Sequence, residues 1–156
     1  MGALIRGAFA GTAATAPMTA VMFLLWRFLP RQLRYPLPPR LITANLLRRL
    51  RLKRATSRKQ ETVLTWVLHF AYGGAMGALF SLFFRALRLP VVLAGTLYGI
   101  MVWLGSYEGL LPTVNLLADA DSQPERRNAV MIAAHLVWGA CTGLLVASLS
   151  EEEVPQ

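Results

Sequence analysis

Four long stretches without a charged side chain divide the sequence into alternating apolar and polar segments. They cover residues 7–26, 62–84, 89–107 and 128–150 and are 20, 23, 19 and 23 residues long. An α-helix of about 20 apolar residues crosses the hydrocarbon core of a bilayer, and a helix satisfies its own backbone hydrogen bonds there. We therefore predict an all-α integral membrane protein, a four-helix bundle in one domain, with spans at about 3–29, 62–85, 90–111 and 127–149.

The polar segments contain signals for the ends of these helices. Three prolines fall within residues 34–40 and predict an extended segment. Residues 41–54 follow and have the pattern of a short amphipathic helix at the membrane surface; a solvated basic loop is the alternative. Pairs with the spacing of a capping box, which predict helix starts, precede the second and fourth spans: Ser57 with Gln60, and Ser122 with Glu125.

The ends of the first three spans leave two further expectations. The link between the second and third spans is short, so these spans should form an antiparallel hairpin. A cleaved signal peptide is the competing interpretation of the first span, because Arg6 precedes an apolar stretch that includes small residues at 13–16. The apolar run continues to Trp26 and then meets basic residues, which favours a span.

Each predicted span contains two glycines four residues apart, which lie on one face of a helix and let another helix approach closely. The eight residues are Gly7, Gly11, Gly73, Gly77, Gly95, Gly99, Gly139 and Gly143. We expect a tightly packed bundle in which any spare glycine face supports a homo-oligomer. Chance placement of one or two pairs is the alternative.

A repeated pattern links the second and fourth spans. His69 begins the sequence His-x-x-aromatic-Gly-x-x-x-Gly, and His135, 66 residues later, begins it again. These two residues are the only histidines of the chain. We predict two tandem helical hairpins with a basic loop, residues 30–60, inserted in the first; such parallel repeats occur in transporters and in proteins that simply duplicated.

Composition and charge agree with a membrane location. Charged residues make up 15% of the chain, against about 25% in soluble domains. The net charge is +8, and residues 27–59 contain eleven Lys or Arg and no acid. A basic segment beside apolar spans indicates anionic lipid headgroups as partners rather than nucleic acid. The predicted lipid-binding residues are Arg40, Arg48, Arg49, Arg51, Lys53 and Arg54. The positive-inside rule places this loop in the cytoplasm and both termini outside.

A few polar side chains fall inside the predicted spans at similar depth. His69 and His135 lie about 10 Å below the same membrane surface, at 1.5 Å per residue, and Glu108 ends the third span on that side. With Tyr72, Trp103, Tyr107 and Trp138 they form a predicted intramembrane polar cluster. It is either a protonatable site on a solute or proton pathway or a set of hydrogen bonds between helices. No pattern indicates a metal, a cofactor or an enzyme.

Two short strings resemble those of a known family. Tyr35-Pro-Leu-Pro-Pro-Arg40 and His135-Leu-Val-Trp138 are similar to segments of the YagU-like bacterial inner-membrane proteins, whose molecular function is unknown. The resemblance covers roughly residues 7–143. It implies a bacterial inner-membrane location and an integral protein without established catalysis.

The function expected from the sequence is a structural or accessory role in the membrane, in which the basic loop binds anionic lipid or a protein partner. The alternative is a small proton-linked permease or channel that uses His69, His135 and Glu108. A membrane enzyme acting on lipid is the third class.

Overall fold

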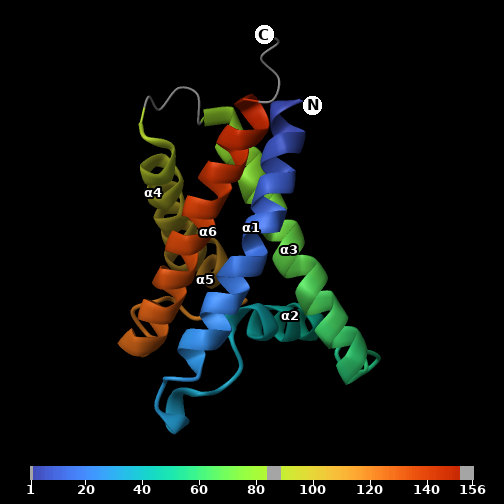
Figure 1. Ribbon diagram of the computed structural model, residues 1–156. Helices are drawn as coiled ribbons and strands as arrows, with labels where there is room; N and C mark the ends of the chain where they lie inside the picture. Colours follow the sequence, from blue (N-terminus) through green and yellow to red (C-terminus); the bar gives the residue numbers. More distant parts are fainter. Residues whose placement is uncertain (1, 84–88, 152–156) are drawn as a thin grey trace.

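The computed structural model describes residues 2–83 and 89–151, and within them every regular element is helical (Figure 1). Four helices are long and apolar enough to cross a membrane. The predicted all-α membrane bundle is therefore confirmed. The predicted end of the second span at residue 85 lies outside the described residues. The elements are α1 (Ala3–Trp26), η1 (Arg31–Leu33), α2 (Pro38–Arg49), α3 (Arg58–Phe83), α4 (Val91–Leu104), the π-helical segment η3 (Gly105–Leu110), α5 (Leu111–Thr113) and α6 (Glu125–Glu151).

The long helices form two pairs that share one further contact. α1 packs along α3, α4 packs along α6, and α1 also packs along α6, whereas α3 and α4 meet at few positions. Figure 1 shows α3 and α4 spreading apart toward the end of the bundle opposite the two termini. The hairpin expected from the short link between these two helices is therefore splayed. We call the end that contains α2 the basic end.

The glycine pairs lie where the paired helices cross. A methyl group added to Gly11 would lie 2.7 Å from Cα of Gly77 on α3, which is closer than side-chain carbons approach backbone. In the second pair, a methyl group on Gly99 would lie 3.2 Å from Cα of Gly139. All eight predicted glycines make such close approaches within the chain. A homo-oligomer would therefore need a surface other than these glycine faces.

These contacts leave the internal repeat asymmetric. The repeat equates α1 with α4 and α3 with α6, and the α1–α3 and α4–α6 crossings correspond to each other. The equivalent of the α1–α6 contact is a contact between α4 and α3, and that contact is almost missing. The glycine faces of α3 and α4 are turned toward α1 and α6, so larger side chains meet between α3 and α4 and hold them apart.

The basic segment differs from its prediction in helix bounds and position. α2 begins at Pro38, inside the stretch expected to be extended, and ends at Arg49 instead of residue 54. Proline is well suited to the first helical position because its missing N–H would have no partner there. The positive φ of Arg51, 59°, follows the helix end. α2 contacts α3, and its Thr43 and Leu47 side chains are buried, so one face of this helix belongs to the bundle.

The two predicted capping boxes have different outcomes. In the first, the Ser57 N–H donates to Gln60 Oε1 at 2.8 Å and the Gln60 N–H donates to Ser57 Oγ at 3.3 Å. The second prediction was wrong, because the Ser122 N–H donates to Asp119 Oδ1 and its hydroxyl to the Asp119 carbonyl. α6 begins only at Glu125, so the acid that should close the box is already the first residue of the helix.

Candidate functional site: an apolar cavity at the basic end

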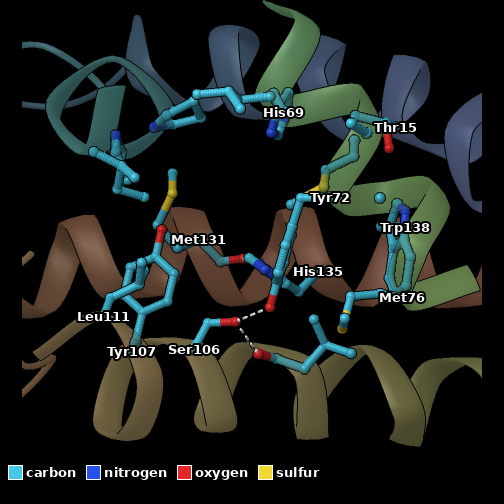
Figure 2. A pocket seen from close by; sticks show the side chains of 18 of the residues that line it. Thr15, His69, Tyr72, Met76, Ser106, Tyr107, Leu111, Met131, His135 and Trp138 are labelled. Atoms are coloured by element: carbon cyan, nitrogen blue, oxygen red, sulfur yellow. Dashed lines mark hydrogen bonds between the residues drawn. The ribbon is translucent and has the colours of Figure 1, made fainter. Parts of the chain in front are cut away.

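A cavity of about 460 Å³ lies between the helices on the side where α3 and α4 diverge (Figure 2). α1, α2, α3, η3 and α6 all contribute to its wall, so it draws on both halves of the chain and on the basic segment. Most of the wall is apolar. The Met, Leu and Ile side chains of this wall are Met18, Met22, Ile42, Leu46, Leu68, Met76, Leu110, Leu111, Leu116 and Met131.

The mouth of the cavity lies between α3 and η3. Tyr72 on α3 and Leu110 on η3 both line the cavity, yet they are 38% and 53% exposed on the outside of the bundle. Both belong to helical segments that are long and apolar enough to cross a membrane.

One hydrogen bond bridges this mouth. The hydroxyls of Tyr72 and Ser106 lie 2.7 Å apart, and Figure 2 marks this hydrogen bond by the dashed line between these two residues. Ser106 donates its own proton to the Val102 carbonyl at 2.6 Å, so the Tyr72 hydroxyl is the donor to Ser106. π-helical segments are rare and frequently lie at functional sites; here η3 turns the adjacent side chains of Ser106 and Tyr107 into the bundle.

His69 lines the cavity from α3 and is oriented by α1. Its Nε2 lies 3.1 Å from the Thr19 hydroxyl, and Thr19 donates its proton to the Thr15 carbonyl at 2.7 Å. The Thr19 oxygen can therefore only accept from the ring, which places the proton of an uncharged His69 on Nε2. Nδ1 of His69 is then a hydrogen-bond acceptor without a partner among the described residues.

His135 on α6 has the opposite tautomer. Its Nδ1 lies 2.7 Å from the Met131 carbonyl, and a carbonyl only accepts, so Nδ1 carries the proton and Nε2 is an acceptor. The Tyr107 ring meets His135 edge to face, with centroids 6.0 Å apart. Neither Nε2 of His135 nor the Tyr107 hydroxyl has a hydrogen-bond partner in the described part of the chain. Neither atom is fully buried by protein, and both residues line the cavity.

The structure divides the predicted polar cluster. His69, Tyr72, Tyr107, His135 and Trp138 line the cavity. The indole N–H of Trp138 donates to the Gly11 carbonyl at 3.0 Å, which joins α6 to α1 at the first glycine crossing.

Two residues of the predicted cluster lie elsewhere. Trp103 is buried behind the cavity wall, with its ring stacked on Tyr107 at 5.8 Å. The prediction for Glu108 was wrong, because its side chain is exposed and accepts a hydrogen bond from the Ala120 N–H at 3.2 Å. Ser106 and Tyr107 are the buried residues of η3, and Glu108 lies past the buried face.

Arg127 is a buried residue that the sequence analysis counted only as a loop charge. It is 3% exposed and donates to the carbonyls of Leu33, Tyr35 and Pro36 at 2.9–3.0 Å. Its guanidinium also lies 3.6 Å from the centre of the Tyr35 ring. Arg127 thereby ties the start of α6 to the chain that leads into α2. Its position next to the helix start gave no signal of this role.

The predicted lipid-binding residues surround α2 and the turn after it. Arg40, Arg48, Arg49, Arg51 and Arg54 are exposed, and Arg49 also donates to the Val114 carbonyl. Lys53 is half-buried and forms an ion pair with Glu61 at the start of α3. Arg40, Arg48 and Arg49 thus lie on the helix that also lines the cavity, and Arg51 and Arg54 lie in the turn after it. Among the described residues, no group of three His, Cys, Asp or Glu side chains could hold a metal.

Comparisons with family models, with curated proteins and with solved structures find no match for this chain. The similarity to YagU-like proteins stays a prediction, and the functional argument depends on the geometry of the cavity.

Proposed function

We propose that the protein is an accessory membrane protein that takes an apolar or amphipathic molecule from the bilayer into the cavity. The observation that supports this most directly is a cavity with an apolar wall that opens between two membrane-spanning helices. Its volume of about 460 Å³ falls in the range of about 300–1,000 Å³ that is typical of small-molecule sites. A water-soluble ligand would have to cross headgroups to reach such an opening, whereas a lipid is already beside it.

The exposed arginines of α2 support the same proposal, because this helix also lines the cavity. Thr43 and Ile42 of this helix line the cavity, while Arg48 and Arg49 near its end are exposed. We infer that the exposed arginines bind anionic headgroups and keep α2 at the membrane surface, each contributing about 1 kcal/mol. By the positive-inside rule this surface is the cytoplasmic one, and the YagU-like resemblance favours the bacterial inner membrane.

Photo-crosslinking tests whether the cavity takes up a molecule from the bilayer. The purified protein is reconstituted in phosphatidylcholine vesicles that contain hexadecane with a mid-chain diazirine, illuminated, digested and mapped by mass spectrometry. We expect adducts on wall residues such as Leu111 and Met131, which are 9% and 3% exposed, besides those on lipid-facing residues such as Val63. Labelling of Val63 alone would contradict the proposal.

A matched pair of substitutions on α3 controls for changes at the lipid-facing surface. Ala75→Phe adds a ring at a lining position, whereas Leu79→Phe adds one at an exposed position one turn further along. Ala75→Phe should largely abolish labelling of Met131 and leave that of Val63 unchanged. Leu79→Phe should leave both unchanged.

A second candidate, the proton-linked permease, is favoured by the position of His69 and His135 on one cavity. Glu108, its third proposed residue, accepts a hydrogen bond from the Ala120 N–H and does not line the cavity. In vesicles with an imposed pH gradient, this candidate requires flux that His69→Ala with His135→Ala removes while the fold is retained. The accessory role requires no flux in the unmodified protein.

A further inference from the structure

If the cavity holds a molecule from the bilayer, as proposed above, its unpaired polar atoms select the head group of that molecule. Burying a polar atom without a partner costs about 1–3 kcal/mol, so a bound ligand gains from pairing these atoms. Three stand out: Nδ1 of His69, Nε2 of His135 and the hydroxyl of Tyr107. The two histidine nitrogens accept hydrogen bonds, because Thr19 fixes the proton of His69 on Nε2 and the Met131 carbonyl fixes that of His135 on Nδ1. The Tyr107 hydroxyl can donate one.

His135 and Tyr107 flank one corner of the cavity. Their rings meet edge to face at 6.0 Å between centroids, and Figure 2 shows the Tyr107 hydroxyl directed from η3 toward Met131 in the middle of the cavity. One residue with an unpaired acceptor and one with an unpaired donor are therefore in ring contact at this corner. The rest of the wall around them, with Leu111 and Met131, is apolar.

Three kinds of head group fit this corner poorly. A ketone, quinone or ether only accepts hydrogen bonds, so it would pair with Tyr107 and leave the His135 nitrogen without a donor. A carboxylate or phosphate would bring a charge into an apolar cavity whose lining, among the described residues, includes no Lys or Arg, which is costly. An ammonium group would meet the same cost without an acid to pair with, since the described lining residues include no Asp or Glu either.

The geometry points to a neutral lipid whose head group is a hydroxyl. Its O–H donates to Nε2 of His135 and its oxygen accepts from the Tyr107 hydroxyl, while its alkyl chain follows the Met and Leu side chains toward the mouth beside Tyr72. His69 offers a second acceptor for a second hydroxyl. Water could pair with the same two atoms and is the competing occupant.

Competition against the photo-crosslinking reaction separates these occupants. Hexadecan-1-ol, its methyl ether and palmitate are each titrated into the vesicles, and the labelling of Met131 by the hexadecane diazirine is followed. One hydrogen bond gained by the alcohol corresponds to about a tenfold lower concentration for half-maximal competition than the ether requires. Palmitate should compete no better than the ether. Equal competition by alcohol and ether would overturn the hydroxyl assignment and would indicate that water occupies the corner.

Two tyrosine variants locate the effect. Tyr107→Phe removes the proposed donor to the ligand oxygen, which the alcohol and the ether both accept, so the concentrations for half-maximal competition should rise severalfold for both while their ratio stays. Tyr98→Phe makes the same chemical change at a residue that does not line the cavity and whose hydroxyl donates to the Met76 carbonyl, and both concentrations should stay. Unchanged competition by alcohol and ether in a folded Tyr107→Phe variant would contradict the assignment, and the alcohol-to-ether ratio of the unmodified protein decides the matter if that variant does not fold.

These outcomes also separate the head-group assignment from the proposed function. Labelling of Met131 that the ether and the alcohol reduce equally leaves the cavity as a lipid site without the hydroxyl preference. Absence of any labelling inside the cavity contradicts the proposed function itself.

Discussion

At the residue scale, Arg127 joins the basic segment to the bundle. A single guanidinium satisfies the carbonyls of Leu33, Tyr35 and Pro36 and covers the Tyr35 ring. Hydrogen bonds from a charged group are worth about 1.5–3 kcal/mol each and do not add fully. One side chain of α6 therefore helps to fix the path of the chain from α1 to α2.

Arg127→Ala should lower the free energy of unfolding by about 2–4 kcal/mol, because three buried carbonyls lose a charged donor. Arg126→Ala, at an exposed position one residue earlier, should change it by less than about 0.5 kcal/mol. Unfolding by denaturant in detergent micelles measures both. Equal effects of the two substitutions would show that Arg127 does not hold the segment.

The residues of the site differ in how far the sequence could predict them. His69 and His135 stand out because each begins one copy of the repeat, and charge-free flanks place them in the membrane. Whether Glu108 faces the bundle depends on the rotation of η3, which a π-helical segment alters and no hydrophobic period reveals. Arg127 looks like an ordinary flanking charge because its partners are backbone carbonyls more than 90 positions away.

At the scale of elements, the glycine crossings determine which helices pair. A side-chain carbon added to Gly77 would meet Cα of Gly11 at 2.6 Å, and neither helix can give way by rotating a side chain. α1 and α3 would have to separate, and their separation would move Thr19 away from His69.

Gly77→Ala should therefore destabilise the protein by about 1–3 kcal/mol, the usual cost of overpacking. Gly105→Ala is the matched control, because nothing lies within 4 Å of a methyl group there. It should be neutral or stabilise by up to about 1 kcal/mol through helix propensity. Thermal unfolding in micelles distinguishes the two; a neutral Gly77→Ala would refute the close α1–α3 crossing.

α2 is held to the bundle by its buried face. Leu47 is 4% exposed, whereas Leu50, at the end of the same helix, is 56% exposed. Leu47→Ser should loosen α2 and speed tryptic cleavage after Arg48 and Arg49 in intact micelles, since local opening exposes backbone to the protease. Leu50→Ser should cleave at the unmodified rate. If both variants cleave alike, α2 does not close the cavity.

Elements in the apolar stretches could be predicted, and the basic segment only in part, because a helix was expected there with other bounds. Charge-free runs of about 20 residues leave little choice but a spanning helix. In the segment before α2, three prolines suggested extended chain, but Pro38 and Pro39 occupy the first turn of a helix, where proline costs nothing. Burial of Thr43 and Leu47 decides that α2 packs inward, and this depends on the neighbouring helices.

At the scale of the whole molecule, charge is concentrated at one end. Arg48, Arg49, Arg51 and Arg54 changed together to Gln should weaken binding of the detergent-solubilised protein to cardiolipin-containing liposomes, measured by co-sedimentation. The loss should resemble that of the unmodified protein in high salt, which screens exposed charges. Unchanged binding would refute a lipid-binding role of the basic segment.

The opening between α3 and α4 is the feature of the whole molecule that the sequence could not show. The repeat and the short link between these helices both suggested close packing. The glycines of α3 and α4 are used on their far sides instead, and the two helices are bridged by the hydroxyls of Tyr72 and Tyr98. A bulky, hydrogen-bonded contact of this kind leaves space where glycines would have closed it.

Quenching of single-tryptophan variants by a dibrominated long-chain alcohol tests most directly whether lipid reaches this space. Of the four tryptophans, Trp66 is 38% exposed, Trp138 lines the cavity and is 2% exposed, and Trp103 does not line it and is 9% exposed. Each is kept in turn while the other three become Phe, and fluorescence is compared in vesicles with and without the brominated alcohol. The cavity account predicts strong quenching of Trp66 and of Trp138, and weak quenching of Trp103. A Trp138 as protected as Trp103 would contradict it.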